Sequence, residues 1–202
     1  MTGMSDTDTG DEPTVLVVED EETLVEIYVQ WLEDTYDTRS ATSGEEALEL
    51  LDSSVSVVLL DRLMPGMSGD EVLEHVRERT AARTAMVTAV EPDFDILSMG
   101  FDDYLTKPVR REELLETVDR LVARTAYAEM ERELFSLIEK RAALVDAKNQ
   151  SDLANSEEFA RLEERIETLR DELDRTLPEI SDGEFVAMVR ALEEEHEEGP
   201  DG

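Results

Sequence analysis

Several apolar runs in this 202-residue chain end at side chains that can bind a metal ion or react with a phosphoryl group. The first run stops at Glu19 and Asp20, and a later one stops at Asp61. Two further runs end near Thr88 and Lys107. Short unbroken apolar runs predict strands buried on both faces of a parallel sheet, whose carboxyl edge is where ligands bind. We therefore expect these five side chains to converge on one cleft.

The types of these residues suit phosphoryl transfer. Three neighbouring carboxylates repel one another unless a divalent cation joins them or a pKa rises, and a few hard oxygen ligands favour Mg²⁺. A carboxylate can also act as a nucleophile and form an acyl phosphate, which makes Asp61 the candidate acceptor. Thr88 can donate a hydrogen bond to a phosphoryl oxygen, and Lys107 can supply a compact positive charge.

Because the chain contains 53 acids, an acid can stand at the end of a strand by chance. A single acid at a strand end is more often a solvated loop residue than a ligand. Lys107 is less easily explained in this way, since it is the only lysine before Lys140 and stands next to a proline. The combination of residue types on matched strand ends therefore carries the hypothesis.

Strand and helix patterns alternate five times in the first 125 residues, which indicates βαβ units and an α/β fold with a doubly wound parallel sheet. Ser68 follows the turn signal Pro65-Gly66 and is a candidate N-cap, and Ser43 with Glu46 predicts a capping box. We expect strands at 14–18, 36–42, 56–60, 85–89 and 103–106, and helices at 24–32, 43–51, 72–76, 92–97 and 112–123.

Beyond about Thr125 the apolar residues recur at heptad spacing, over 130–144 and again over 159–173, with a polar break between them. We expect two helices that form an antiparallel hairpin, the second of which ends at Pro178. A capping box at Ser181 predicts a last short helix that runs to Leu192. The apolar surface of the hairpin favours a homodimer. The alternatives are a hairpin that packs on its own N-terminal domain or one that extends the last helix of that domain.

The chain carries 53 acids against 19 bases, a formal net charge of −34. This charge argues against direct binding of nucleic acid, which requires a basic face, and it fits a halophilic cytoplasm, where salt screens the repulsion. The chain has no cysteine, so disulfides are excluded. No apolar run approaches the length of about 18 residues that a membrane span needs. We expect residues 1–12 to be a disordered acidic lead and 193–202 to be a disordered acidic tail.

Residues 13–125 resemble the receiver domain of response regulators in two-component signalling. The matching pieces are VVEDE at 17–21, LDRLMPGMSG at 60–69, VTA at 87–89 and YLTKP at 104–108. The resemblance implies a flavodoxin-like five-stranded sheet of order 2-1-3-4-5 and a cis peptide bond before Pro108. It also implies a cytoplasmic protein that accepts phosphoryl from a sensor histidine kinase.

In the terms of this resemblance, Asp61 is the phosphoacceptor. Glu19 and Asp20 are the acidic pair, and Mg²⁺ is held by Asp20, Asp61 and the backbone carbonyl of Leu63. Thr88 and Lys107 contact the phosphoryl group.

Tyr104 matches the switch aromatic, which turns inward when Thr88 moves toward the phosphoryl group, so that the interaction surface or the oligomeric state changes. Leu63 and Val90 are apolar at positions that influence hydrolysis of the acyl phosphate. We therefore expect slow autodephosphorylation.

Residues 126–192 resemble the HalX domain, an all-helical module that follows receivers in haloarchaeal regulators, on their placement and the entry Tyr127-Ala128-Glu129. We interpret the chain as a response regulator with an unknown downstream protein partner, and not as a turnover enzyme. Two alternatives remain open: a transcription regulator that contacts DNA through the helical module, and a constitutive scaffold that does not depend on phosphorylation.

Overall fold

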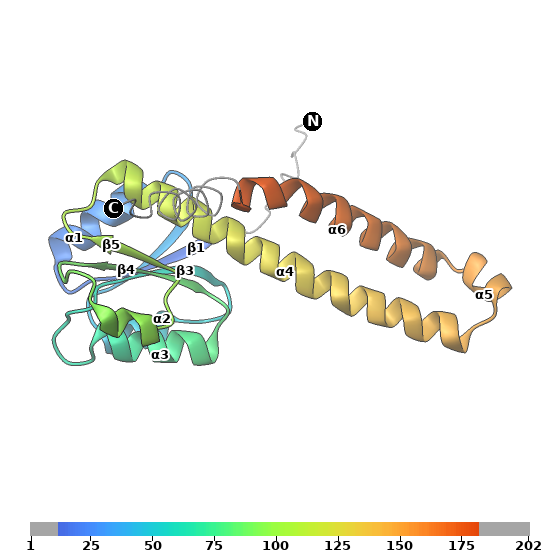
Figure 1. The fold of residues 1–202 in the computed structure, drawn as a ribbon, viewed down its shortest axis with the longest axis horizontal. Helices are drawn as coiled ribbons and strands as arrows, with labels where there is room; N and C mark the ends of the chain where they lie inside the picture. The colour runs from blue at the N-terminus through green and yellow to red at the C-terminus, as the bar shows by residue number, and fades with distance from the viewer. Residues whose placement is uncertain (1–11, 182–202) are drawn as a thin grey trace, which may run out of the picture. The chain divides into compact units, whose positions relative to one another are not determined.

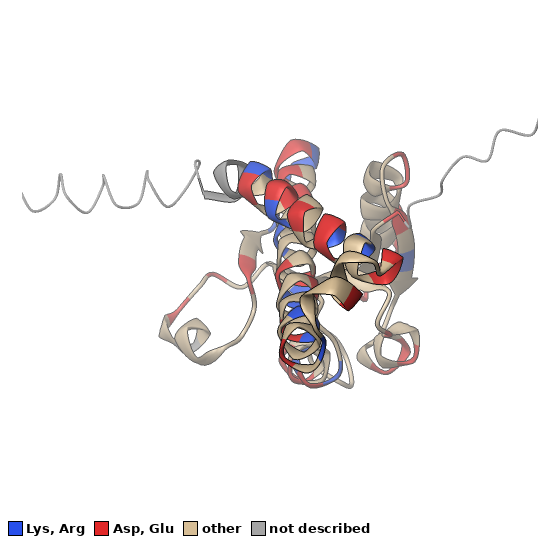
Figure 2. Ribbon diagram, turned by 90° about the vertical axis from the view of Figure 1, so that its right-hand side faces the viewer, with Lys and Arg blue, Asp and Glu red and all other residues tan. Residues whose placement is uncertain are grey.

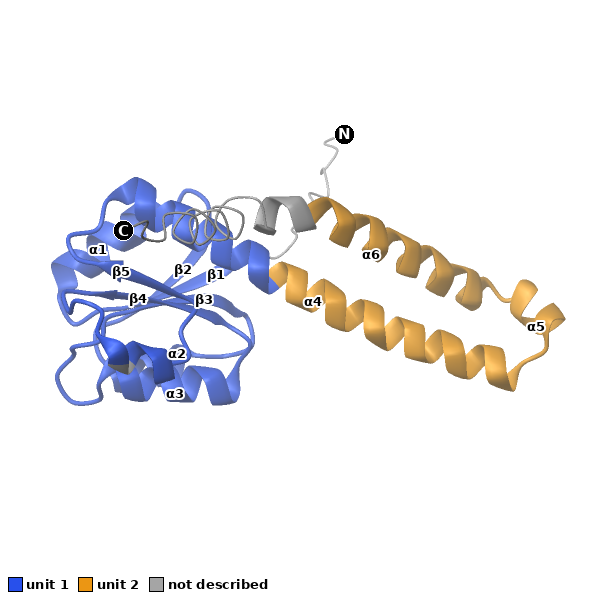
Figure 3. Ribbon diagram, viewed as in Figure 1, with its two compact units in different colours: residues 1–125 blue, residues 126–202 orange. Residues whose placement is uncertain are grey.

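The structure is a computed structural model that describes residues 12–181. The chain divides into two compact units, residues 1–125 and residues 126–202, which Figure 3 shows in different colours. We call them the N-terminal and the C-terminal unit and describe each by itself. The expected helix beyond Ser181, the tail at 193–202 and nearly all of the lead lie outside the described residues.

The N-terminal unit contains a five-stranded sheet of order β2-β1-β3-β4-β5, in which all neighbouring strands are parallel (Figure 1). This order confirms the expected flavodoxin-like arrangement. The strands are β1 (Thr14–Val18), β2 (Asp37–Ala41), β3 (Val55–Leu60), β4 (Arg83–Thr88) and β5 (Asp103–Thr106).

The unbroken apolar runs of β1 and β3 are explained by burial on both faces of the sheet. Alternate residues enter two separate core clusters, with Val57 and Leu59 in one and Val58 and Leu60 in the other. The first cluster is completed by helix α1 (Glu22–Leu32) and the start of helix α4, and the second by α2 (Gly44–Leu50) and α3 (Gly69–Arg79). Neither cluster includes the residues that directly follow β1 and β3, so these positions can carry polar side chains.

The capping predictions hold at α3 and in part at α2. The Ser68 hydroxyl accepts from the Glu71 N–H, and the Glu71 carboxylate accepts from the Ser68 N–H, which completes a capping box. At α2 the Ser43 hydroxyl accepts from the Glu46 N–H, but the Glu46 carboxylate accepts from Thr42 instead of Ser43.

The connection between β4 and β5 differs from the expected helix at 92–97. It contains one 3₁₀ helix, η1 (Phe94–Ser98), which Asp93 caps by accepting from the Phe94 N–H at 2.7 Å. Phe94 and Leu97 are 86% and 80% exposed, so η1 has no apolar face against the core to prolong it. The connection stands out at the left of Figure 2.

Helix α4 (Arg111–Ala147) is 37 residues long and passes without interruption through the division between the units. The expected helix at 112–123 and the first heptad helix are therefore one element, as in the alternative in which the module extends the last helix. The polar break contains a short helix, α5 (Gln150–Ala154). The expected end at Pro178 is wrong, because helix α6 (Glu157–Ser181) continues past this proline, which has no N–H to donate to the carbonyl four residues earlier.

In the C-terminal unit α6 runs antiparallel to α4, and the ribbon colours of Figure 2 mark acidic and basic residues along both helices. Arg165 forms two hydrogen bonds with Glu133, at 2.9 and 2.8 Å, and Arg141 pairs with Glu163. The α6 side chains that face inward, Ile166, Leu169 and Leu173, are buried. Nearer the tip the packing opens, and every residue from 139 to 150 is exposed. Among the described residues, no helix is both long enough and apolar enough to cross a membrane.

Candidate functional site

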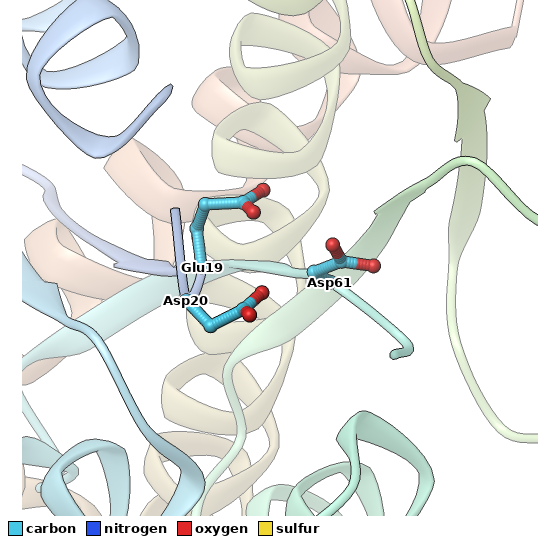
Figure 4. A group of neighbouring side chains, drawn as sticks. All are labelled: Glu19, Asp20 and Asp61. Atoms are coloured by element: carbon cyan, nitrogen blue, oxygen red, sulfur yellow. The ribbon is translucent and has the colours of Figure 1, made fainter. Parts of the chain in front are cut away.

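Glu19, Asp20 and Asp61 lie together at the carboxyl edge of the sheet. Each offers a carboxylate oxygen, and these oxygens lie within 4.8 Å of one another; Figure 4 shows the three side chains gathered on one side of the strand ends. The backbone holds them there, because the Asp61 N–H donates to the Val18 carbonyl at 2.9 Å and the Glu19 N–H donates to the Ala41 carbonyl at 3.1 Å. The sheet hydrogen bonds thus continue one residue past the strands.

Lys107 joins two of these acids from the end of β5. Its Nζ donates to Asp61 Oδ2 at 2.6 Å and to Glu19 Oε2 at 2.5 Å. Its N–H donates to the Thr88 carbonyl at 2.8 Å, and the Lys107-Pro108 peptide is cis, as the resemblance implies. The sequence thus placed this lysine correctly beside the acids, although strands β3 and β5 are not neighbours in the sheet.

Burial and charge act against each other in this cluster. Burial raises the pKa of Glu19, and its hydrogen bond with Lys107 only partly offsets that rise. Burial also lowers the pKa of Lys107, but the hydrogen bonds and charges of Asp61 and Glu19 outweigh it and leave this pKa above its usual value. Lys107 is therefore charged at neutral pH and positioned against the candidate acceptor.

Thr88 and Tyr104 are linked through Val90, whose backbone forms a hydrogen bond with each of their side chains. Thr88 is fully buried at the end of β4, and its Oγ1 accepts from the Val90 N–H at 3.4 Å. The Tyr104 hydroxyl donates to the Val90 carbonyl at 2.7 Å, and its half-buried ring lies 5.5 Å from the ring of Phe101. A displacement of Thr88 would therefore act on the segment that holds Tyr104.

The loop after Asp61 is shaped by two glycines. Gly66 has a φ of 80°, which suits a glycine, and the Leu63 N–H donates to Asp61 Oδ1 at 3.2 Å. Gly69 begins α3 so close to the acceptor backbone that a Cβ there would lie 2.1 Å from the Asp61 carbonyl oxygen. The sequence analysis missed Gly69, because only the tertiary contact shows why a side chain is excluded.

The residues present fit a divalent cation. Three carboxylates lie together, and the single ammonium group of Lys107 pairs with two of them, which leaves an excess of negative charge at a partly buried edge. Their donors are hard oxygen atoms, as Mg²⁺ prefers. Glu19, Asp20 and Asp61 would supply the side-chain ligands.

Comparison with known proteins gives the family. Residues 15–119 match the response regulator receiver domain, and residues 123–189 match the HalX domain. The chain belongs to the response regulator receiver family. A crystal structure of a CheY-like receiver from Methanospirillum hungatei is 26% identical and covers 57% of this chain and 97% of its own, with a TM-score of 0.53. The beryllofluoride-activated DrrB receiver is 28% identical, covers 55% and 97% of the two chains, and has a TM-score of 0.52.

Relatives of this receiver are regulators of several kinds. A Haloferax volcanii protein named "Putative transcriptional regulator" is 46% identical over 163 residues, which cover 80% of this chain but 28% of that protein. The sensory transduction protein RegX3 of Mycobacterium tuberculosis is 36% identical over 55% of this chain and 51% of its own length. The chain thus spans about half or less of these relatives.

The receiver domain also carries an apolar groove beside its acidic site. The groove has a volume of about 420 Å³ and includes Lys107 in its wall. The α1 side chains that line it include Leu24, Ile27 and Trp31, and Pro108 and Val109 face them from the segment after β5. Neither motif nor periodicity had marked these residues as a surface, because their spacing is that of an ordinary core face.

Proposed function

We propose that this protein is a cytoplasmic response regulator of a two-component system that accepts a phosphoryl group on Asp61. The observation that supports this most directly is Lys107 Nζ, which donates to Asp61 Oδ2 at 2.6 Å inside a cluster of three carboxylates. A carboxylate with only a structural role would need neither the two additional acids nor a partly buried ammonium group.

The proposed step transfers phosphoryl from a phosphohistidine nitrogen to an Asp61 carboxylate oxygen. The P–N bond breaks as the O–P bond forms, and the imidazole nitrogen leaves with the electron pair and takes up a proton. Lys107 offsets the charge on the phosphoryl oxygens, and Thr88 donates a hydrogen bond from its hydroxyl once it moves toward them. Mg²⁺, when bound, would neutralise further charge on the transferring group. Glu19, Asp20, Asp61 and the Leu63 carbonyl are the proposed ligands.

Signal output is proposed to pass through Tyr104. The hydrogen bond from its hydroxyl to the Val90 carbonyl and the contact of Val90 with Thr88 connect the site to the exposed connection that carries Phe94. A shift of Thr88 would alter this surface, which downstream partners could bind.

The partner that delivers the phosphoryl group is proposed to be a sensor histidine kinase. A protein donor must dock beside Asp61, and the apolar groove on α1 borders Lys107. Ile27→Arg should therefore slow transfer from phosphorylated kinases at least about tenfold, whereas Gln30→Arg, an exposed position on the same helix, should not. Phosphotransfer profiling against the histidine kinases of the source organism measures this. Equal rates for both variants would contradict docking in the groove.

The central test uses a small phosphodonor, which separates the chemistry from the partner. The protein is incubated with phosphoramidate in molar KCl with Mg²⁺, and its mass is measured. Wild type should gain one phosphoryl group, as should Asp34→Asn, which changes an exposed acid after α1. Asp61→Asn and a sample without divalent cation should gain none. Phosphorylation of Asp61→Asn to the wild-type extent would overturn the proposal.

A second candidate is a transcription regulator that contacts DNA, which the name of the Haloferax relative favours. The net charge of −34 argues against it. A gel shift in molar KCl decides between them, because sequence-specific retardation would support the second candidate. The acidic composition, together with that relative, supports a halophilic cytoplasm as the setting.

A further inference from the structure

Helix α4 carries an apolar stripe in addition to the heptad positions found over 130–144. Phe135, Ile138, Ala142 and Val145 follow one another at spacings of three, four and three residues, which is the spacing that a helix presents to another helix. Phe135 is 68% exposed and Val145 is 46% exposed, while Ala142 is exposed and Ile138 is half-buried. Within the described C-terminal unit this stripe is therefore left largely exposed, with Ile138 as its half-buried member.

The two ends of the stripe have complementary shapes. One end carries the exposed ring of Phe135. At the other end Val145 lines a cavity of about 460 Å³, whose further apolar walls are Leu153, Ala154 and Phe159. The distance between the ends is about 15 Å for ten residues of helix. A projecting ring and an apolar cavity on one straight face form a surface that fits a copy of itself turned end to end.

We propose that this stripe is an interface between two copies of the chain, with their α4 helices antiparallel. Phe135 of each copy enters the cavity beside Val145 of the other, and Ile138 packs against Ala142 of the other. The pairing is isologous, so each contact occurs twice and the assembly closes as a dimer.

Charge also favours a second copy at this place. The segment 135–156, which contains the stripe and most of the cavity wall, carries three acids against three bases, whereas the whole chain carries −34. Two strongly acidic molecules repel each other least where each is close to neutral. The same balance disfavours an anionic membrane or nucleic acid, which need a dense basic cluster.

The test is sedimentation equilibrium of the full-length, unphosphorylated protein in molar KCl, over about 1–100 µM. Because a single helix crossing buries a small interface, we expect a wild-type dimer with micromolar dissociation. Ala142→Glu should weaken it about 100-fold, since an unpaired charge enters the interface. The matched control is Ala143→Glu, an equally exposed neighbour turned about 100° round the helix, which should dimerise like wild type.

Phe135→Ala supplies a second variant that adds no charge, and it should weaken the dimer about tenfold or more. Circular dichroism establishes that each variant keeps its helix content. A monomeric wild type at 100 µM would overturn the proposal. So would equal dimerisation by Ala142→Glu and Ala143→Glu, because the copies would then meet on another surface.

Discussion

The receiver domain and the tip of the helical hairpin differ in how far their apolar side chains are covered. In the receiver, β1, β3 and β4 are buried on both faces, and the polar site lies on ends that this packing holds rigid. At the tip, α4 continues as a regular helix although all its residues from 139 to 147 are exposed. The apolar side chains of the receiver are therefore covered by packing within the chain, whereas those at the hairpin tip are exposed and available to a partner.

The largest difference should appear when a leucine is shortened in each region. Leu59→Ala removes a fully buried side chain from the receiver core and should cost about 2–5 kcal/mol of unfolding free energy. Leu144→Ala changes a partly exposed side chain at the tip and should cost less than about 1 kcal/mol. Urea unfolding in molar KCl measures both, and similar losses would contradict the contrast.

The tightness of the receiver near its site can be tested at Gly69. Gly69→Ala places a Cβ against the Asp61 carbonyl oxygen and should cost about 2 kcal/mol and slow phosphorylation by phosphoramidate about tenfold. Gly100→Ala is the control, because its Cβ would meet only the flexible end of Arg77. A Gly69→Ala protein that accepts phosphoryl at the normal rate would show that the loop can shift.

A smaller effect is expected on the lifetime of the phosphorylated receiver. Leu63 is 65% exposed beside Asp61 and has no polar atom in its side chain to orient a water molecule. We expect dephosphorylation over minutes or longer, and Leu63→Asn should speed it severalfold. Loss of the phosphoryl mass over time measures this, and a wild-type lifetime of seconds would refute it.

The smallest effect should come from the ion pairs along the hairpin. Arg165→Ala removes the two hydrogen bonds to Glu133 at an exposed site and should cost at most about 0.5 kcal/mol in molar KCl. The hydrogen bond with Arg165 holds the pKa of Glu133 below its usual value. The contribution is therefore present at neutral pH and lost as the pH falls through that lowered pKa. A pH-independent loss would contradict this reading.

Much of the receiver could be predicted from the sequence because its signals are local. Unbroken apolar runs marked the buried strands, and the residue at the end of each run placed Glu19, Asp61 and Lys107 at one edge. Ser68, which follows the turn signal Pro65-Gly66, predicted the start of α3, and the structure confirms it as the N-cap. The roles of the site residues remain predictions, since they concern a reaction and not a fold.

Other features depended on contacts between distant parts of the chain. Pro92 did not begin an α-helix, because the connection after β4 has no core face against which to pack. Heptad spacing predicted two helices in the C-terminal unit. It did not predict that the first would be continuous with the last receiver helix, because the sequence near Thr125 contains neither a helix-ending signal nor one that requires the helix to continue.

The sequence by itself thus determined the strand pattern, the acidic edge and the helical character of the C-terminal unit, because each follows from neighbours along the chain. Only the tertiary structure decided that Gly69 must lack a side chain and that Lys107 bridges Glu19 and Asp61. It alone showed that Phe135 on α4 stays exposed, whereas Ile166 and Leu169 on α6 are buried. The physical reason is that burial is a property of what packs against a residue, and periodicity shows only which residues share a face.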